Sequence, residues 1–216
     1  MNKIKGCIFD LDGVIVDTAK YHYLAWSSLA KELGIAFNED DNERLKGVSR
    51  MESLNIILSL GNKKMTLEEK ELLADKKNKK YVECIDKLKE EEILPGVKEF
   101  LQELRNEGIK ISLGSASKNS RFILDKLALK NYFDCIIDGN KISKAKPDPE
   151  VFLAAVREME LKSEECVVFE DALAGIRAAH NGGMKVIGVG SEENLSEADL
   201  VIKGFEGIST DILSKL

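Results

Sequence analysis

Two carboxylates lie two residues apart where the first apolar run of the chain ends. Asp10 and Asp12 follow residues 4–9 within the motif Asp-Leu-Asp-Gly. Two acids this close repel each other, and an enzyme can use such a pair when a cation neutralises one and the other exchanges a proton. An Asp-rich turn would also explain the motif taken alone. The interpretation therefore depends on what else the chain contains.

A second acid pair follows a second apolar run. Glu170 and Asp171 come directly after residues 166–169 and precede a predicted helix over residues 172–179. Asp171 could simply cap that helix. Two acid pairs at two strand ends favour a site for a hard cation instead, because Mg²⁺ prefers carboxylate oxygens and leaves room for phosphate.

Two further segments could hold a phosphate beside these acids. Residues 113–119, Leu-Gly-Ser-Ala-Ser-Lys-Asn, form a turn of small residues ahead of a helix, where backbone amides and a hydroxyl can bind an anion, although Ser and Asn are also ordinary caps. Lys146 lies between Ala145 and Pro147 in a loop that its prolines stiffen. A lysine fixed beside an acid cluster offsets its repulsion and can hold phosphoryl oxygens, whereas without the acids it would be a solvated side chain.

The elements that must position these residues alternate along the chain. Near-continuous apolar runs cover residues 4–9, 109–114, 135–137, 166–169, 186–189 and 200–202. Such runs are typical of strands buried on both faces of a parallel sheet. From Pro95 onward they alternate with amphipathic stretches, which predicts a doubly wound α/β domain with its ligands at the carboxyl edge of the sheet.

An insertion separates the first two predicted strands. About a hundred residues lie between them, more than one crossover helix needs. Residues 17–33 carry apolar residues at helical spacing and end at Gly34, and a capping box at residues 66–69 opens a charged helix that runs to residue 88. We interpret the charged run 86–92 as a solvated helix end, and Leu94-Pro95-Gly96 as the return to the main domain. The predicted domains are a core of residues 1–16 and 95–216 and an all-helical insert of residues 17–94.

Composition limits the kinds of partner that the protein can bind. The net charge of −6, from 38 acidic and 32 basic residues, argues against nucleic acid. No run approaches the roughly 18 apolar residues of a membrane span, and the N-terminus has no signal peptide pattern. The four cysteines are far apart and are expected to be free thiols. We expect a cytoplasmic monomer that binds neither nucleic acid nor membrane.

The four segments Asp-Leu-Asp-Gly, Ser-Ala-Ser, Lys-Pro-Asp-Pro and Glu-Asp, in this order, resemble the motifs of the haloacid dehalogenase superfamily of phosphotransferases. The resemblance spans nearly the whole chain. It implies a Rossmann-like core with a helical cap inserted after the first motif. It also implies that Asp10 is the nucleophile, that Asp12 is the acid and base, and that Ser115 and Lys146 hold the transferring group. The implied cofactor is Mg²⁺, with its ligands at Asp10, the backbone carbonyl of Asp12, Glu170 and Asp171.

Within the superfamily, the cap segments resemble those of sugar-phosphate mutases. These segments are residues 45–50, Leu-Lys-Gly-Val-Ser-Arg, the pairs Tyr21-His22 and Ala25-Trp26, and Lys77-Asn78 with Tyr81-Val82. The resemblance implies conversion of β-glucose 1-phosphate into glucose 6-phosphate through an aspartyl-phosphate and a hexose bisphosphate. The expected substrate contacts are Trp26, Gly47, Val48, Ser49, Arg50, Lys77, Ser115, Ala116, Ser117, Lys118, Asn119 and Lys146, with Thr18 and His22 as hinge or support.

Two other functions are compatible with parts of this pattern. A phosphatase on the same scaffold would pass the phosphoryl group from Asp10 to water, and the core motifs do not separate it from a mutase. A non-catalytic phosphate-binding protein is disfavoured because the nucleophile, the acid/base, the lysine and the metal acids are all present. In the insert, Arg50 could instead cap or solvate a helix, Lys77 could be exposed among other lysines, and His22 and Trp26 could be packing residues.

Overall fold

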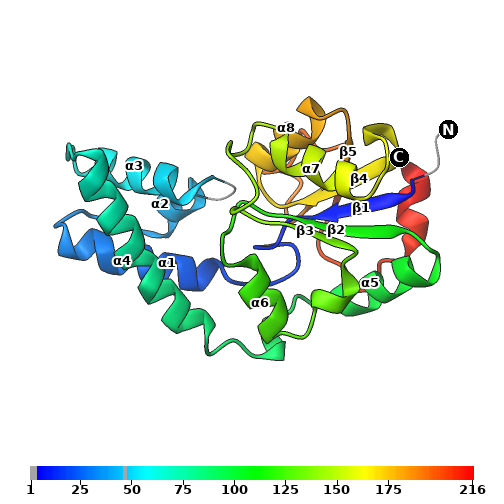
Figure 1. Ribbon diagram of the computed structural model, residues 1–216, viewed down its shortest axis with the longest axis horizontal. Coiled ribbons are helices and arrows are strands. Elements are labelled where there is room, and N and C mark those ends of the chain that lie inside the picture. The colour runs from blue at the N-terminus through cyan, green and yellow to red at the C-terminus, as the bar shows by residue number, and fades with distance from the viewer. Residues whose placement is uncertain (1–3, 46–47) are drawn as a thin grey trace.

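The computed structural model describes residues 4–45 and 48–216, and its centre is a six-stranded parallel sheet in the order β3-β2-β1-β4-β5-β6 (Figure 1). The strands are β1 Gly6–Phe9, β2 Lys110–Gly114, β3 Cys135–Ile137, β4 Cys166–Glu170, β5 Lys185–Val189 and β6 Leu200–Ile202. Every predicted strand is present, with bounds shifted by no more than two residues. The predicted doubly wound α/β fold is confirmed.

Helices cover both faces of the sheet. One face is covered by α5 Val97–Asn106, α6 Ser120–Lys126 and the 3₁₀ turn η4 Thr210–Lys215, and the other by α7 Glu150–Glu158 and α8 Leu173–Asn181 (Figure 1). Short 3₁₀ turns occur at η2 Lys130–Tyr132 and η3 Ser163–Glu165. All four residues of β1 are fully or almost fully buried. Apolar strands between two helical layers explain why the runs are continuous rather than alternating.

Four aromatic rings pack on the α5 face of the sheet. Phe9 and Phe169, paired across β1 and β4, stack with ring centroids 4.6 Å apart. Phe100 meets Phe169 edge to face at 5.5 Å, and Phe205 lies 5.1 Å from Phe100. Both strands that end in acids are therefore anchored by large buried side chains, which hold the two strand ends in fixed register.

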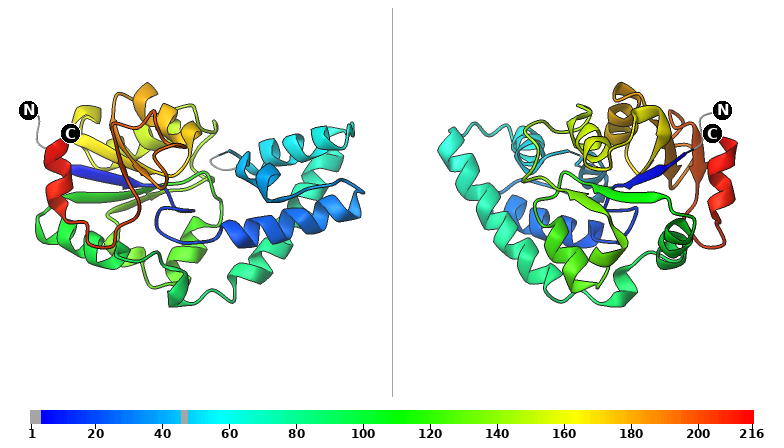
Figure 2. Two further views of the ribbon diagram at one scale, coloured as in Figure 1. Left: turned by 180° about the vertical axis from the view of Figure 1, so that it is seen from behind. Right: turned by 45° about the vertical axis from the view of Figure 1, so that its right-hand side comes forward.

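The insert is helical, as predicted, and stands to one end of the sheet (Figure 2). It contains α1 Ala19–Glu32, α2 Glu39–Glu43, α3 Arg50–Leu60 and α4 Leu67–Ile85. Trp26, Leu29, Leu54 and Ile57 belong to an apolar cluster of its own. The predicted capping box opens α4, with Thr66 and Glu69 each accepting from the other's backbone N–H. The last turns of α4 pack outside the cluster of the insert. They belong to the cluster that covers the sheet.

Two connections between the sheet and the insert run side by side. The Leu94 N–H donates to the Ile15 carbonyl at 3.0 Å, and the Asp17 N–H to the Glu92 carbonyl at 2.8 Å. The Glu92 carboxylate accepts from Lys20 Nζ at 2.6 Å and from the Tyr21 hydroxyl at 2.7 Å. The interpretation of residues 86–92 as a solvated helix end is confirmed for the charged residues up to Glu91, which are exposed, but not for Glu92, which is half-buried and paired. Helix α4 ends at Ile85, and the 3₁₀ turn η1 Glu90–Glu92 presents a carboxylate that ties the two connections together.

Three further sequence predictions concern the start of α5, the cysteines and membrane-spanning helices. Gly96 has φ +80° and is the N-cap of α5, as its place after Pro95 suggests. The four cysteines are free. In the part of the chain that the structure describes, a helix of sufficient length and apolarity to cross a bilayer is not found.

Candidate active site

Two buried carboxylates meet at the carboxyl edge of the sheet. Phe9 of β1 pairs with Phe169 of β4, so the next residues, Asp10 and Glu170, lie side by side. Asp10 is 8% exposed and Glu170 is fully buried. In the sheet order β1 lies between β2 and β4, which is the point at which open α/β sheets bind ligands. The edge predicted from the sequence is thus the place where the acids converge.

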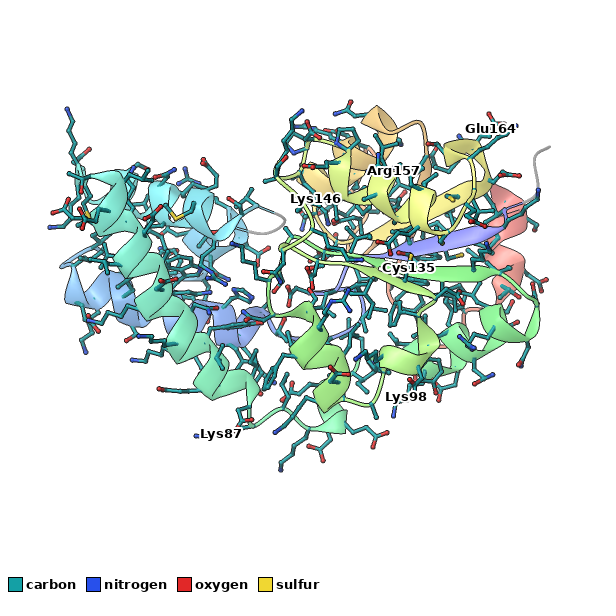
Figure 3. The ribbon with its side chains drawn as sticks, in the orientation of Figure 1. Lys87, Lys98, Cys135, Lys146, Arg157 and Glu164 are labelled. Atoms are coloured by element: carbon teal, nitrogen blue, oxygen red, sulfur yellow. The ribbon has the colours of Figure 1, made fainter. Side chains whose placement is uncertain are left out.

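Lys146 forms an ion pair with both of these carboxylates. Its Nζ lies 2.6 Å from Asp10 Oδ1 and 2.5 Å from Glu170 Oε1, and the residue is 3% exposed. Burial alone would lower the pKa of Lys146, but the two carboxylates raise it well above its ordinary value. The lysine approaches the edge of the core that faces α1–α4 (Figure 3). It is therefore a permanent cation beside the predicted nucleophile, as the Pro-flanked loop suggests.

Asp12 differs from Asp10 in its surroundings. Its Oδ1 accepts a hydrogen bond from the Thr18 hydroxyl, which for that reason does not cap α1. Burial, and next the charge of Asp10, raise the pKa of Asp12 to about 6. A carboxyl with this pKa can be either protonated or ionised near neutral pH. The geometry thus makes Asp12 suitable for proton transfer.

Two glycines make room for the second acid pair. Gly13 has φ +80°, and a Cβ built there would lie 2.2 Å from Asp171 Oδ2. A Cβ at Gly175 would lie 1.9 Å from Glu170 Oε1. The other oxygen of Glu170 accepts from the Ala172 N–H at 2.9 Å. Gly13, the last residue of the first motif, therefore makes room for the Asp171 carboxylate as well as forming the turn.

The donor chemistry of the site fits a hard divalent cation. The carboxylates of Asp10, Glu170 and Asp171 lie at one edge, and Gly13 leaves space for the last of them beside the Asp12 backbone. Within residues 4–45 and 48–216, however, no three His, Cys, Asp or Glu side chains converge closely enough to form a ready metal cage, and Lys146 lies between Asp10 and Glu170. The four-residue ligand set stays a prediction.

The loop of residues 115–119 is rigid at its beginning. Ser115 is 1% exposed and its N–H donates to the Ile137 carbonyl at 3.0 Å. Its hydroxyl oxygen accepts from the Ser117 N–H at 3.1 Å, and the Ser117 hydroxyl oxygen accepts from the Asn119 N–H at 3.3 Å. Ala116 and Lys118 lie between these turns, partly buried and exposed respectively. The loop follows β2, the neighbour of β1, as expected for a phosphate-binding turn.

Lys77 is buried on the insert side. It is 3% exposed, and its Nζ lies 2.9 Å from His22 Nδ1 and over the rings of Trp26 and Tyr81, at 4.5 and 4.7 Å. Burial, and next the charge of Arg50, lower the pKa of Lys77 to about 7. The alternative of an exposed lysine is excluded. Asp12 attracts its charge across the two parts of the molecule.

The remaining predicted residues divide between the two sides. Trp26 is buried in the apolar cluster of the insert, so it packs there while its ring faces Lys77. Burial lowers the pKa of the half-buried Arg50 at the start of α3, where Ser49 is the N-cap. Val48 is half-buried, and Gly47 lies outside the described residues. Burial lowers the pKa of His22 well below its usual range, and its Nε2 has no hydrogen-bond partner in the described part of the chain.

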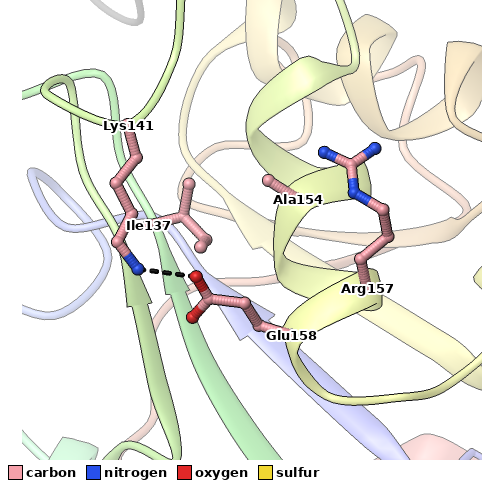
Figure 4. A pocket seen from close by; sticks show the side chains of 5 residues that line it. All are labelled: Ile137, Lys141, Ala154, Arg157 and Glu158. Carbon is pink, nitrogen blue, oxygen red and sulfur yellow. Dashed lines mark hydrogen bonds and ion pairs between the residues drawn. The ribbon is translucent and has the colours of Figure 1, made fainter.

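Two hollows lie elsewhere, along the β3 edge. One, of about 390 Å³, is lined by Ile137, Lys141, Ala154, Arg157 and Glu158 (Figure 4). Lys141 and Glu158 form an ion pair of 2.6 Å in it. The second shares these two residues. Neither hollow contains the acid cluster or Lys146, so neither coincides with the candidate active site at the carboxyl edge of the sheet.

Comparisons with known proteins show the family of the chain and its relatives. The family model described as haloacid dehalogenase-like hydrolase matches residues 7–189. The β-phosphoglucomutase of Bacillus subtilis is 44% identical over 97% of this chain and 94% of that protein. A phosphorylated carbohydrates phosphatase of Thermotoga maritima is 32% identical over 85% of this chain and 84% of that protein. A crystal structure of β-phosphoglucomutase from Clostridium difficile has a TM-score of 0.94 and 43% identity, covering 98% of this chain and 96% of the other.

Proposed function

The chain belongs to the haloacid dehalogenase-like hydrolase family, and from this premise we propose that it is a Mg²⁺-dependent β-phosphoglucomutase. It would interconvert β-glucose 1-phosphate and glucose 6-phosphate through an aspartyl-phosphate and β-glucose 1,6-bisphosphate. The observation that carries the proposal is the contact of Asp10 with a buried, charged Lys146 at the strand end that also carries Asp12, whose pKa is raised to about 6. Similarity at 44% and 43% to two β-phosphoglucomutases supports the choice of substrate.

The residues supply the chemistry in two half-reactions. A carboxylate oxygen of Asp10 attacks phosphorus, the new oxygen–phosphorus bond forms, and the bond from phosphorus to the sugar oxygen breaks. Asp12 donates its proton to that leaving oxygen. In the return step Asp12 takes a proton from the accepting sugar hydroxyl, which attacks the aspartyl-phosphate and frees Asp10.

Charge on the transferring group is held by fixed partners. Lys146 and the Ser115 hydroxyl would bind its oxygens, and their burial at the edge where Asp10 lies supports this role. When bound by Asp10, Glu170, Asp171 and the Asp12 backbone carbonyl, Mg²⁺ would neutralise developing negative charge.

The insert has the role of a cap in this proposal. Residues 17–94 would close over the sheet edge and exclude water from the aspartyl-phosphate. A bisphosphate carries a second phosphoryl group far from Asp10, and Arg50 would bind it, with Lys118 and Asn119 contributing from the core. The guanidinium can donate two parallel hydrogen bonds to phosphate oxygens.

Product analysis tests the mutase against a phosphatase, the second candidate that the 32% identical relative favours. The enzyme is given β-glucose 1-phosphate, Mg²⁺ and a trace of glucose 1,6-bisphosphate, and glucose 6-phosphate and free phosphate are measured separately. We expect mostly glucose 6-phosphate. Arg50→Ala should lower kcat/KM by about 100-fold, the value of one charged phosphate contact, with circular dichroism unchanged. The exposed Arg44→Ala is the matched control. If free phosphate dominates with every hexose phosphate tried, the phosphatase is the correct function.

Metal removal tests the cofactor. Excess EDTA should stop turnover and added Mg²⁺ should restore it, because the acid cluster then lacks its compensating cation. Asp171→Ala should weaken Mg²⁺ binding, measured by calorimetry, by at least about tenfold. Glu164→Ala, at the far end of the core in Figure 3, should leave it unchanged. Full activity in EDTA would refute the metal requirement.

A further inference from the structure

One side-chain hydrogen bond joins α4 of the insert to the loop of residues 115–119. Asn119 Nδ2 donates to Asn78 Oδ1 at 2.9 Å, and both residues are partly buried. Asn78 follows Lys77, which is itself fixed over two aromatic rings. The contact therefore begins at a well-anchored point of the insert and ends at the last residue of the predicted phosphate loop.

The core fixes the backbone of this loop by other contacts. Asn140 Nδ2 donates to the Lys118 carbonyl at 3.2 Å, and the Gly139 N–H donates to the Ser117 carbonyl at 3.2 Å. A Cβ at Gly139 would lie 2.2 Å from the Ala116 carbonyl oxygen, so the two turns are in close contact. These contacts reach main-chain atoms. Among the described residues, the hydrogen bond that the structure gives to the side-chain amide of Asn119 is the one to Asn78.

The orientation of that amide decides what it can bind. An asparagine side chain carries two N–H donors at one end and a carbonyl acceptor at the other, and phosphate oxygens accept only from the donors. In this structure the Asn78 Oδ1 atom accepts one Nδ2 hydrogen, which turns the donor end of the Asn119 amide toward α4. The same Nδ2 atom carries a second hydrogen that can be donated to a phosphate oxygen.

We propose that Asn78 is a positioning residue that orients the Asn119 amide toward the second phosphoryl group of the substrate. Binding of that group and docking of the insert on the core are then coupled, because one amide takes part in both. The inference rests on the proposed function for the identity of the phosphate ligand.

A double-mutant cycle tests whether Asn78 acts through Asn119. We expect Asn78→Ala and Asn119→Ala each to raise the KM for β-glucose 1-phosphate about 5- to 10-fold, with kcat within about twofold. The double variant should be no worse than Asn119→Ala alone. Lys79→Ala, an exposed neighbour on α4, is the control. Multiplied effects in the double variant, or an unchanged KM in Asn78→Ala, would overturn the proposal.

A conservative variant and a substrate-free measurement complete the test. Asn78→Asp keeps the acceptor, so its KM should lie closer to wild type than that of Asn78→Ala. In the free enzyme, the NMR signals of the Asn119 side-chain amide should move in Asn78→Ala and stay in Lys79→Ala. If those signals do not move, the positioning role is refuted whatever the substrate. If they move but the wild type turns over no hexose phosphate, only the proposed function fails.

Discussion

Asp10 and Asp12 share one motif, and their surroundings give them different properties. Asp10 contacts the charged, buried Lys146 at 2.6 Å. Asp12 receives a hydroxyl hydrogen bond and lies next to the Asp10 charge, and its pKa rises to about 6. Neighbouring carboxyls in different environments are a recurring basis for dividing nucleophile from acid.

The raised pKa of Asp12 predicts a pH dependence of stability. The unfolded carboxyl has its ordinary pKa of 3.8 and the folded one titrates near 6, so the folded state binds more protons between these values. The contribution to the free energy of unfolding is therefore fully present below pH 3.8 and is lost as the pH rises through about 6. Urea unfolding of metal-free protein across this window should show a larger loss in wild type than in Asp12→Asn, which keeps the contribution of Glu170, whose pKa burial also raises. Parallel curves would contradict the shift.

At the scale of elements, the glycine before α5 supports the return of the chain from insert to sheet. Gly96 has φ +80°, and a Cβ there would lie 2.4 Å from the Phe205 carbonyl oxygen. We expect Gly96→Ala to lower the free energy of unfolding by about 2–4 kcal/mol, because backbone strain and a clash with main-chain atoms add. Gly108→Ala is the matched control. Its φ is +70° but its surroundings are open, so strain alone should cost about 1 kcal/mol. Equal losses in thermal or urea unfolding would disprove the clash.

What could be predicted from the sequence follows from how local each signal is. Strands, the α4 capping box and the acid edge depend on short patterns, and these are confirmed. The burial of Lys77 could have been predicted from the sequence. Its position falls on one helical stripe that is buried in the structure, with Ala74, Tyr81 and Ile85. The contacts of Glu92 could not have been predicted from the sequence. Its partners Lys20 and Tyr21 are about seventy residues away, and no pattern near Glu92 indicates them. The Asn78–Asn119 contact is equally nonlocal.

At the scale of the whole molecule, two packing regimes meet along α4. Ala74 of α4 belongs to the cluster within the insert, whereas Tyr81 and Ile85, further along the same helix, belong to the cluster that covers the sheet. The hydrogen-bonded connections near Val16 and Ile93 complete this junction. A helix with its two ends in different clusters can transmit the position of the insert to the sheet edge, where Asp12 and Lys77 attract each other.

This division predicts that the insert can open locally while the sheet stays folded. Leu54 is fully buried in the insert cluster, so Leu54→Ala should remove about 2–5 kcal/mol of packing there. In native-state hydrogen exchange, protection should fall in α1, α3 and the first turns of α4, and persist in β1, β2 and β4, because separate clusters open as separate cooperative units. Ile187→Ala, equally buried in the cluster that covers the sheet, is the matched control and should lower protection in the strands. A uniform loss of protection across both parts in Leu54→Ala would mean that insert and core unfold as one unit, and the insert could not then act as a separately moving cap.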